Sequence, residues 1–325
     1  MSGGARSTKV LYIGGYSRSG STLLLRLLGE HPGVAAVGEL FDVWDRNYLK
    51  NQLCGCGLGF RDCAFWRQVT ARVFDCTPGH VPAARLHRQR SRVQGHSKIP
   101  ALWLPELRSP RFRRELRSYA MVLDGLYTAV REVSGSEVIV DSSKVPQYAW
   151  VLAEAPGIEL HMVHLVRDSR ATAFSWQRQR IRPEITAKRT YMDTHSLVRS
   201  ASEWSLFNYL VRSRRSSYAS YTLIKYEDLV ASPRSELQKV VQAAGLACRS
   251  DHVPDSLGVS HTASGNPGRF RVGHLGISLD AEWMHAMSGA ERTIVTALTA
   301  AGLARYRYPL LARSTSEALP SSVES

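Results

Sequence analysis

The chain has 325 residues, of which 44% are hydrophobic and 22% are charged, and its formal charge is +14. This composition is typical of a soluble globular protein, and it excludes a membrane-spanning class because no stretch approaches the roughly 20 apolar residues of a span. The positive charge favours an anionic partner, such as a nucleotide, an acidic substrate, a membrane surface or a nucleic acid. The N-terminus, MSGGARSTK, lacks the apolar region of a signal peptide, so we expect a cytoplasmic protein.

Strand-like and helix-like runs alternate along the chain. The hydrophobic pattern predicts strands at 9–14, 34–37, 137–140, 159–166 and 221–225. It predicts helices at 21–31, 116–133, 146–155, 169–179, 195–215, 234–244, 280–288 and 290–301. Residues 42–120 have weak periodicity, and we expect an insertion of short helices and loops there. The alternation predicts an α/β fold of the P-loop-like, three-layer kind, with a central, mainly parallel sheet and helices on both faces.

The domain organisation follows from the absence of an internal repeat or a clear linker. We expect one domain over residues 9–311, between disordered ends at 1–8 and 312–325. Four predicted strands end in polar clusters: Tyr16–Thr22, Asp141–Lys144, Arg167–Arg170 and Lys225–Asp228. Ligands of parallel α/β sheets bind at the carboxyl ends of the strands, so these clusters predict a site.

The segment GGYSRSGST, residues 14–22, lies between a predicted strand and a predicted helix. Gly15 and Gly20 allow tight turns, and backbone N–H groups at the helix N-terminus can cradle an anion. The loop adds side-chain donors: Arg18, Ser19, Ser21 and Thr22. However, Ser21 stands where the GxxxxGK[ST] loop has its lysine. The alternative to an anion site is a Gly/Ser turn that only joins strand to helix.

A second motif, VRDSRATAFSW, covers residues 166–176. Arg167 ends a predicted strand, and Ser175 lies about two turns into the following helix, which we expect to be capped by Ser169. A planar guanidinium and a hydroxyl could grip a second phosphate. The alternative is a capped helix with a surface Arg–Asp pair.

Together, RSGST, GVAAVGE, VDSSK, VRDSRATAFS and IKYEDL resemble the sulfotransferase family that uses 3′-phosphoadenosine 5′-phosphosulfate (PAPS). The resemblance is to the bacterial, carbohydrate and tyrosylprotein branches, and it covers about residues 9 to 275. It implies transfer of a sulfuryl group from PAPS to an acceptor hydroxyl, with release of adenosine 3′,5′-bisphosphate. The acceptor could be a carbohydrate, glycolipid, phenol or natural product.

The resemblance also implies cosubstrate contacts. The residues that would hold the 5′-phosphosulfate are Arg18, Ser19, Gly20, Ser21 and Thr22. Arg167 and Ser175 would hold the 3′-phosphate, and Tyr226 would lie near the adenosine. The stretch GNPGRFRVG, residues 265–273, resembles a basic loop that closes over the 3′-phosphate, with Arg269 better placed than Arg271.

Catalytic groups are implied in the same way. Glu39 lies 21 residues after Arg18 and matches the base of the tyrosylprotein branch. Lys144 matches a lysine near the transferred group, and Arg18 would assist it. These residues could instead be a surface carboxylate and ordinary loop cations. The fallback bases are His31, His161 and His164, of which His164 is better explained as a core histidine. We expect no metal, because Arg and Lys supply the positive charge.

Three of the five cysteines cluster in CGCGLGFRDC: Cys54, Cys56 and Cys63. A structural zinc site normally has four Cys/His ligands with CxxC spacing, and this CxC has no matching second pair. Cys76 or His80 could complete a site. A local disulfide or packed thiols are favoured over a metal.

Two other classes remain as rivals. One is a nucleotide-dependent kinase with a degenerate P-loop, for which Asp141 is the nearest magnesium ligand. The other is a non-enzymatic basic protein that binds nucleic acid or membrane through the arginine-rich segment 85–117. For the sulfotransferase we expect a small-molecule, glycan or lipid acceptor and no nucleic acid, and we leave open a peripheral membrane contact and a homodimer. The aromatic residues that could line an acceptor pocket, or only pack, are Trp44, Tyr48, Phe65, Trp66, Trp103 and Tyr191.

Overall fold

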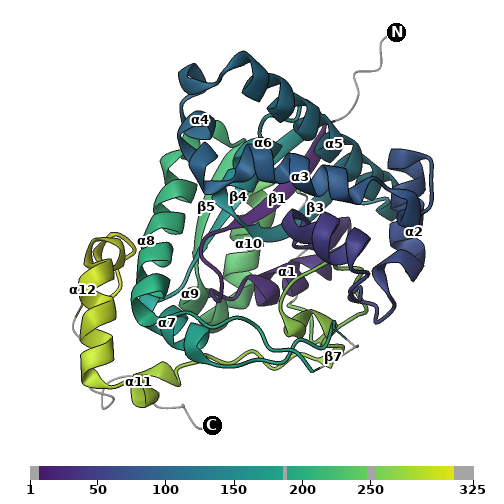
Figure 1. Cartoon of the computed structure of the whole chain (residues 1–325). Coiled ribbons are helices and arrows are strands. Elements are labelled where there is room, and N and C mark those ends of the chain that lie inside the picture. Colours follow the sequence, from purple (N-terminus) through teal and green to yellow (C-terminus); the bar gives the residue numbers. More distant parts are fainter. Residues whose placement is uncertain (1–6, 186–188, 247–252, 311–325) are drawn as a thin grey trace.

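The computed structural model describes residues 7–185, 189–246 and 253–310 (Figure 1). Within these residues one sheet of five strands has the order β2-β3-β1-β4-β5, and every pairing in it is parallel. Its strands are β1 (Thr8–Gly14), β2 (Val34–Gly38), β3 (Val138–Lys144), β4 (Ile158–Val166) and β5 (Ser220–Lys225). The predicted α/β fold is confirmed, and each predicted strand is present.

Helices cover both faces of the sheet (Figure 1). Those before β4 are α1 (Ser21–Gly29), α2 (Ala64–Phe74), α3 (Ala83–Gln94), α4 (Ile99–Trp103), α5 (Pro110–Ser134) and α6 (Pro146–Leu152). Those after β4 are α7 (Ser169–Gln177), α8 (Leu197–Ser213), α9 (Tyr226–Ala231), α10 (Pro233–Ala243), α11 (Trp283–Ala286) and α12 (Gly289–Arg305). None of the described helices combines the length and apolar character that crossing a membrane requires.

The three layers follow from side-chain alternation along the strands. In β1, Val10 and Tyr12 enter one core cluster with residues of α2, α3, α5 and α6. Leu11 and Ile13 enter a second cluster, which contains the leucines of α1 and the apolar face of α10. Because β1 is buried on both faces, its sequence is a continuous apolar run rather than an alternating one.

Some predicted boundaries were wrong. Helix α5 begins at Pro110, six residues before the predicted start, because Ser109 caps it by accepting from the backbone N–H of Phe112. The cap of α7 is Asp168, not Ser169: its carboxylate accepts from the Arg170 backbone N–H at 2.9 Å. The sequence did not predict α9 or the short antiparallel pair β6 (Ser256–Leu257) and β7 (Gly273–His274).

The predicted disordered ends are residues 1–8 and 312–325. Thr8 already belongs to β1, so the predicted disordered segment 1–8 was too long at its C-terminal end. The rest of these ends, apart from Ser7, lies outside the described residues. One domain over 9–311 stays a prediction.

Several aromatic residues of the 42–120 segment are core residues rather than pocket residues. Trp44, Tyr48 and Trp66 are buried in the cluster on the α5 face of the sheet. The Trp44 indole N–H donates to the Tyr119 hydroxyl at 2.9 Å, and the Trp44 and Tyr48 rings stack at 5.3 Å. Their packing fixes the insertion to the sheet.

The buried histidine of β4 makes stability depend on pH. His164 Nε2 lies 2.9 Å from the Asn208 Oδ1 acceptor, and Nδ1 lies 2.6 Å from the Tyr221 hydroxyl. Burial lowers the pKa of His164 from 6.5 to about 4. Between these values the unfolded chain binds more protons, so this stabilisation is present above about pH 6.5 and is lost as the pH falls towards about 4.

We therefore expect the free energy of unfolding of the wild type to fall by about 3 kcal/mol more than that of His164→Gln between about pH 7 and pH 4. Urea denaturation at several pH values measures the free energy of unfolding of the wild type and of the variant. The variant is needed because burial raises the pKa of Asp141 to about 6, which has the opposite effect on stability. An equal pH dependence in the two proteins would contradict a neutral, buried His164.

Candidate active site

The loop between β1 and α1 has the backbone of an anion-binding turn. Gly15, Arg18 and Gly20 have φ values of 131°, 70° and 90°. A Cβ on Gly15 would lie 2.4 Å from the Leu165 carbonyl oxygen, and one on Gly20 would lie 2.4 Å from the Tyr226 ring. Larger residues at these positions would therefore displace the strand or the ring that the loop contacts.

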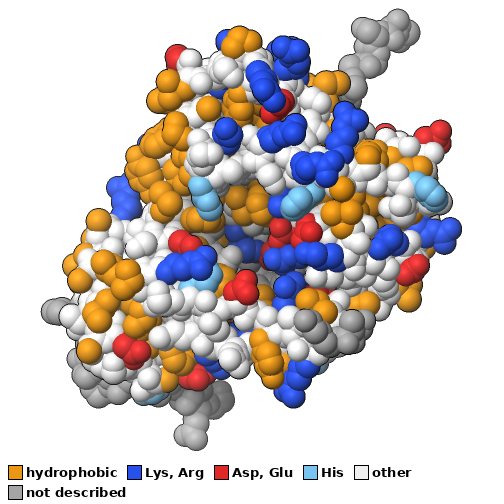
Figure 2. Space-filling model, in the orientation of Figure 1, with side chains coloured by type: hydrophobic (Ala, Val, Ile, Leu, Met, Phe, Trp, Pro, Cys, Tyr) orange, Lys and Arg blue, Asp and Glu red, His pale blue; other side chains and the backbone are white. Residues whose placement is uncertain are grey.

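A cavity of about 230 Å³ lies where β1, β4 and β5 end. Seven of the predicted site residues line it: Arg18, Gly20, Ser21, Thr22, Arg167, Ser175 and Tyr226. Its other lining residues are Leu23, Arg180, Asn266, Gly268 and Asp280. Figure 2 shows a hollow near the centre of the face drawn in Figure 1, with basic and acidic side chains around it. The two motifs thus meet at one cavity.

Positive charge is concentrated at this cavity. The Arg18 guanidinium donates to Asn266 Oδ1 at 3.2 Å and lies 4.9 Å from the centre of the Trp176 ring. Burial and the neighbouring Arg180 lower the pKa of Arg18 to about 10. Burial, followed by the positive charges of Arg178 and Arg167, also lowers the pKa of Arg180. An anion in the cavity would relieve this repulsion.

The second motif supplies Arg167, which is buried. Its guanidinium pairs with the Asp280 carboxylate at 3.2 Å, donates to the Asp280 carbonyl at 2.7 Å and lies 4.4 Å from the centre of the Tyr226 ring. Among the described residues, neither Arg167 Nε nor the buried Ser19 hydroxyl has a hydrogen-bond partner. Buried donors without partners are costly, and a ligand oxygen could satisfy Arg167, which lines the cavity; Ser19 is not among the lining residues.

Glu39 and Lys144 form a partly buried ion pair. Lys144 Nζ lies 2.5 Å from Glu39 Oε1 and also donates to the Ser142 carbonyl at 2.7 Å. The Glu39 backbone N–H donates to the Ser264 carbonyl at 3.1 Å, and Asn266, two residues further on, contacts Arg18. The charge of Glu39 also favours the protonated form of Arg18. The predicted base and the predicted lysine therefore lie together. Neither is among the residues that line the cavity, but Glu39 is hydrogen-bonded to the segment that contains Asn266, which does line it.

Arg269 is not among the residues that line the cavity. It is buried, and its guanidinium donates to the carbonyls of Thr262 at 2.8 Å and Leu53 at 2.6 Å. Arg271 is exposed and contacts the His274 carbonyl. The stretch 265–273 reaches the cavity instead through Asn266 and Gly268, because Arg269 is used to join two loops.

The fallback histidines are not brought to the cavity. His31 Nδ1 lies 2.9 Å from the Pro32 carbonyl, and His161 contacts Ser220 and Glu159. His164 is satisfied within the core, as the sequence favoured. Glu39 therefore stays the better placed of the predicted bases.

Three polar or charged residues of the cavity were missed by sequence reasoning: Arg180, Asn266 and Asp280. Arg180 follows α7 at the start of a segment that folds back, with the Met192 backbone N–H donating to the Arg180 carbonyl at 2.8 Å. The excess of arginine was visible in the sequence, but no spacing singled out Arg180. Asn266 lies in GNPGRFRVG, where Arg269 and Arg271 were the predicted phosphate ligands.

Comparisons with known proteins identify the family and the fold. A sequence model described as the sulfotransferase family matches residues 11–251. Among solved structures, the sulfotransferase domain of the Synechococcus PCC 7002 olefin synthase is 18% identical over 95% of this chain and 98% of that domain, with a TM-score of 0.53. The chain belongs to the sulfotransferase family, and the shared fold is that of bacterial sulfotransferase domains.

Other similarities are weaker. The sulfotransferase domain of the curacin biosynthetic pathway is 13% identical over 94% of this chain and 100% of that domain, with a TM-score of 0.49. Sulfotransferase STF9 from Mycobacterium avium is 13% identical over 95% of this chain and 79% of that chain, with a TM-score of 0.45. No curated protein sequence matches the chain significantly.

Proposed function

We propose that this protein transfers a sulfuryl group from PAPS to an acceptor hydroxyl and releases adenosine 3′,5′-bisphosphate. The observation that carries the proposal is the meeting of the two arginine motifs at one cavity between strand ends. A donor with two phosphate groups matches a cavity lined by two sets of cationic and hydroxyl donors, one from the loop after β1 and one from Arg167 and Ser175. The donor supplies the activated sulfuryl group, and the protein supplies binding, orientation and charge.

The residues present fit such a donor. The 5′-phosphosulfate would be held by the loop residues Arg18, Ser19, Gly20, Ser21 and Thr22. Arg167 and Ser175 would hold the 3′-phosphate, and Arg180 would take the role predicted for Arg269. The ring of Tyr226, which packs on Gly20, would border the adenosine. This fit rests on two observations. Arg167 Nε has no hydrogen-bond partner among the described residues, and the guanidinium groups of Arg18 and Arg180 lie close enough to repel each other.

Glu39 and Lys144 have complementary tasks in this proposal. The Glu39 carboxylate would accept the proton of the acceptor hydroxyl. Lys144 would stabilise negative charge on the oxygen that leaves sulfur, with Arg18 assisting. Their ion pair holds the two side chains beside the Asn266 segment, so both can face the same reacting group.

The kinase alternative is disfavoured by Asp141. The carboxylate is fully buried, and it accepts from the Tyr127 hydroxyl at 2.5 Å and from the Ser143 backbone N–H at 2.6 Å. Both carboxylate oxygens are therefore occupied by these donors, and Asp141 is not among the residues that line the cavity. Ser21 also stands in place of the P-loop lysine. The described residues at this cavity therefore lack the two groups that a P-loop kinase needs here: a lysine for the phosphates and a carboxylate free to hold magnesium.

The nucleic-acid alternative rests on segment 85–117, in which two of the nine arginines are held by partners within the protein and the other seven are exposed. Arg90 pairs with Asp42 at 3.1 Å, and Arg108 pairs with Glu154 at 2.8 Å and donates to backbone carbonyls. These two arginines stabilise the insertion rather than present a free surface. We further propose a cytoplasmic enzyme whose acceptor is a small molecule, glycan or lipid.

A transfer screen tests this function. The protein is incubated with sulfur-labelled PAPS and one member of each acceptor class: a carbohydrate, a glycolipid, a phenol and a hydroxylated natural product. We expect labelled product from at least one class, without added magnesium. Transfer of phosphate from ATP, with no transfer from PAPS, would establish the kinase alternative instead.

A further inference from the structure

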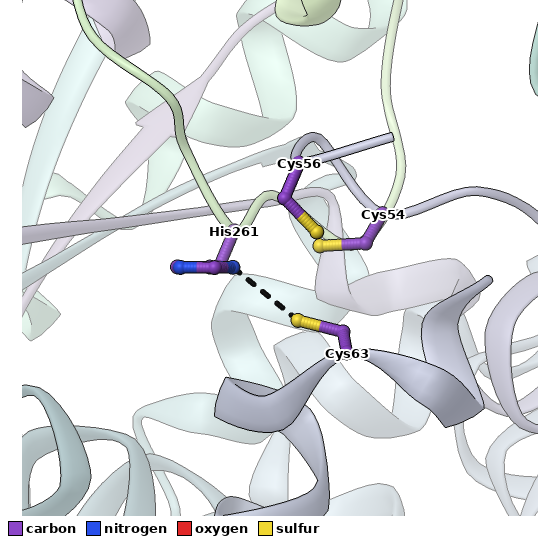
Figure 3. A group of neighbouring side chains, drawn as sticks. All are labelled: Cys54, Cys56, Cys63 and His261. Carbon is purple, nitrogen blue, oxygen red and sulfur yellow. Dashed lines mark hydrogen bonds between the residues drawn. The ribbon is translucent and has the colours of Figure 1, made fainter. Parts of the chain in front are cut away.

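Three cysteines and one histidine converge outside the cavity (Figure 3). Cys54, Cys56, Cys63 and His261 each present one ligand atom, and these atoms all lie within 4.8 Å of one another. Cys63 Sγ lies 3.3 Å from His261 Nδ1. The sequence offered three of these ligands, and the fourth lies 198 residues beyond Cys63.

The donor set is that of a structural zinc site. Three thiolates and one imidazole bind zinc tetrahedrally, with Zn–S distances of about 2.3 Å and Zn–N distances of about 2.0 Å. The ligand atoms of such a tetrahedron are about 3.5 to 3.8 Å apart. The four atoms here would have to approach by no more than about 1 Å to reach that geometry. We propose that Cys54, Cys56, Cys63 and His261 bind one zinc ion.

The surrounding backbone holds the two ligands of the CxC motif. The Gly57 N–H donates to the Cys54 carbonyl at 2.9 Å, and the Cys54 N–H donates to the Leu58 carbonyl at 2.8 Å. Gly57 has a φ of 88°, which a side chain would disfavour. This tight turn places both thiols on the side that faces Cys63 (Figure 3).

The other two ligands are also oriented by their neighbours. Cys63 directly precedes α2, and its N–H donates to the Gly59 carbonyl at 3.1 Å. The His261 ring stacks on Phe65 at 5.2 Å with an interplanar angle of 13°, and the His261 carbonyl accepts from the Trp66 indole at 2.8 Å. Contacts of this kind fix a ligand's ring before the metal arrives.

The sequence-based preference for a disulfide or packed thiols does not explain the histidine. Cys54, Cys56 and Cys63 are all free, and so is Cys76. A disulfide between any two of the clustered cysteines would leave the third beside His261 with no chemical task. Zinc uses all four groups at once, and neither Cys76 nor His80 belongs to the set.

The site would fasten two distant loops. The Gly55 N–H donates to the Thr262 carbonyl at 2.9 Å, and Arg269 bridges the Thr262 and Leu53 carbonyls. The second loop continues to Asn266, which lines the cavity. Because all four coordination positions are filled by the protein, the zinc would be structural rather than catalytic. This inference stands independently of the proposed function.

Metal analysis tests it. The full-length protein, purified without a histidine tag or chelator, should contain about one zinc per chain by elemental mass spectrometry. Cys63→Ser should lose most of that zinc, whereas the matched control Cys76→Ser should keep it. Cobalt bound in place of zinc should show sulfur-to-cobalt charge-transfer bands and the intense visible bands of tetrahedral cobalt. A wild-type protein that contains no zinc and takes up neither zinc nor cobalt would overturn the proposal.

A second measurement covers a variant that fails to fold. Alkylation of the native wild-type protein, mapped by mass spectrometry, should label Cys76 while Cys54, Cys56 and Cys63 stay protected. A strong chelator should release the zinc, expose the three thiols and lower the melting temperature. Rapid labelling of all three without chelator, a disulfide among them, or iron in place of zinc would each contradict the proposal.

Discussion

Replacement of Glu39 by Gln should lower turnover by about 10²-fold or more, because an amide cannot accept the proton of the acceptor hydroxyl. The change keeps the shape of the side chain, so binding of adenosine 3′,5′-bisphosphate should change little. Initial rates at saturating PAPS, with an acceptor found in the transfer screen, measure the effect. Calorimetric titration with the bisphosphate measures binding.

The expected loss depends on position as well as on charge. Glu39 is paired with Lys144 beside the cavity, whereas Glu106 is exposed on the 42–120 insertion. Glu106→Gln is therefore the matched control, and it should keep wild-type turnover. If Glu39→Gln also kept it, another group would have to be the base. If Glu39→Gln weakened bisphosphate binding as much as turnover, its role would be in binding.

Replacement of Arg167 by Gln should raise the dissociation constant for adenosine 3′,5′-bisphosphate by about 10- to 100-fold, because hydrogen bonds to charged groups contribute about 1.5 to 3 kcal/mol. The affinity for adenosine 5′-monophosphate, which lacks the 3′-phosphate, should change much less. Isothermal titration calorimetry of both nucleotides separates the two phosphate positions.

The control for Arg167 is an exposed arginine of helix α3, Arg85. Arg85→Gln lowers the net charge by the same amount and should bind both nucleotides as the wild type does. Since Arg167 also pairs with Asp280, its variant is first compared with the wild type by thermal unfolding. An equal loss of affinity for both nucleotides would contradict a contact specific to the 3′-phosphate.

The sequence predicted the fold and much of the candidate site because both are encoded locally. Strand β1, the glycine loop and helix α1 follow one another directly in the sequence. Strand β4, Arg167 and helix α7 are likewise consecutive. Parallel pairing then brings strand ends together without further information. This is why Arg18, Arg167 and Tyr226 could be predicted to share a site.

The site residues that could not be predicted lie in loops, and their positions depend on how those loops return to the sheet. Arg180 and Asn266 reach the cavity from segments without a regular pattern. Arg269 looked like a phosphate ligand, but its buried guanidinium joins two loops through backbone carbonyls. His261 shares no motif with the cysteines, since its place beside Cys63 is fixed by the fold of the chain between them.

Calorimetric titration of the wild-type protein with adenosine 3′,5′-bisphosphate tests the central claim most directly, because it needs no knowledge of the acceptor. We predict saturable binding at one site without magnesium, and weaker binding when either phosphate is missing. ATP with magnesium should bind more weakly than the bisphosphate. Binding of ATP with magnesium but not of the bisphosphate would contradict the assignment of the cavity to a 3′-phosphoadenosine donor.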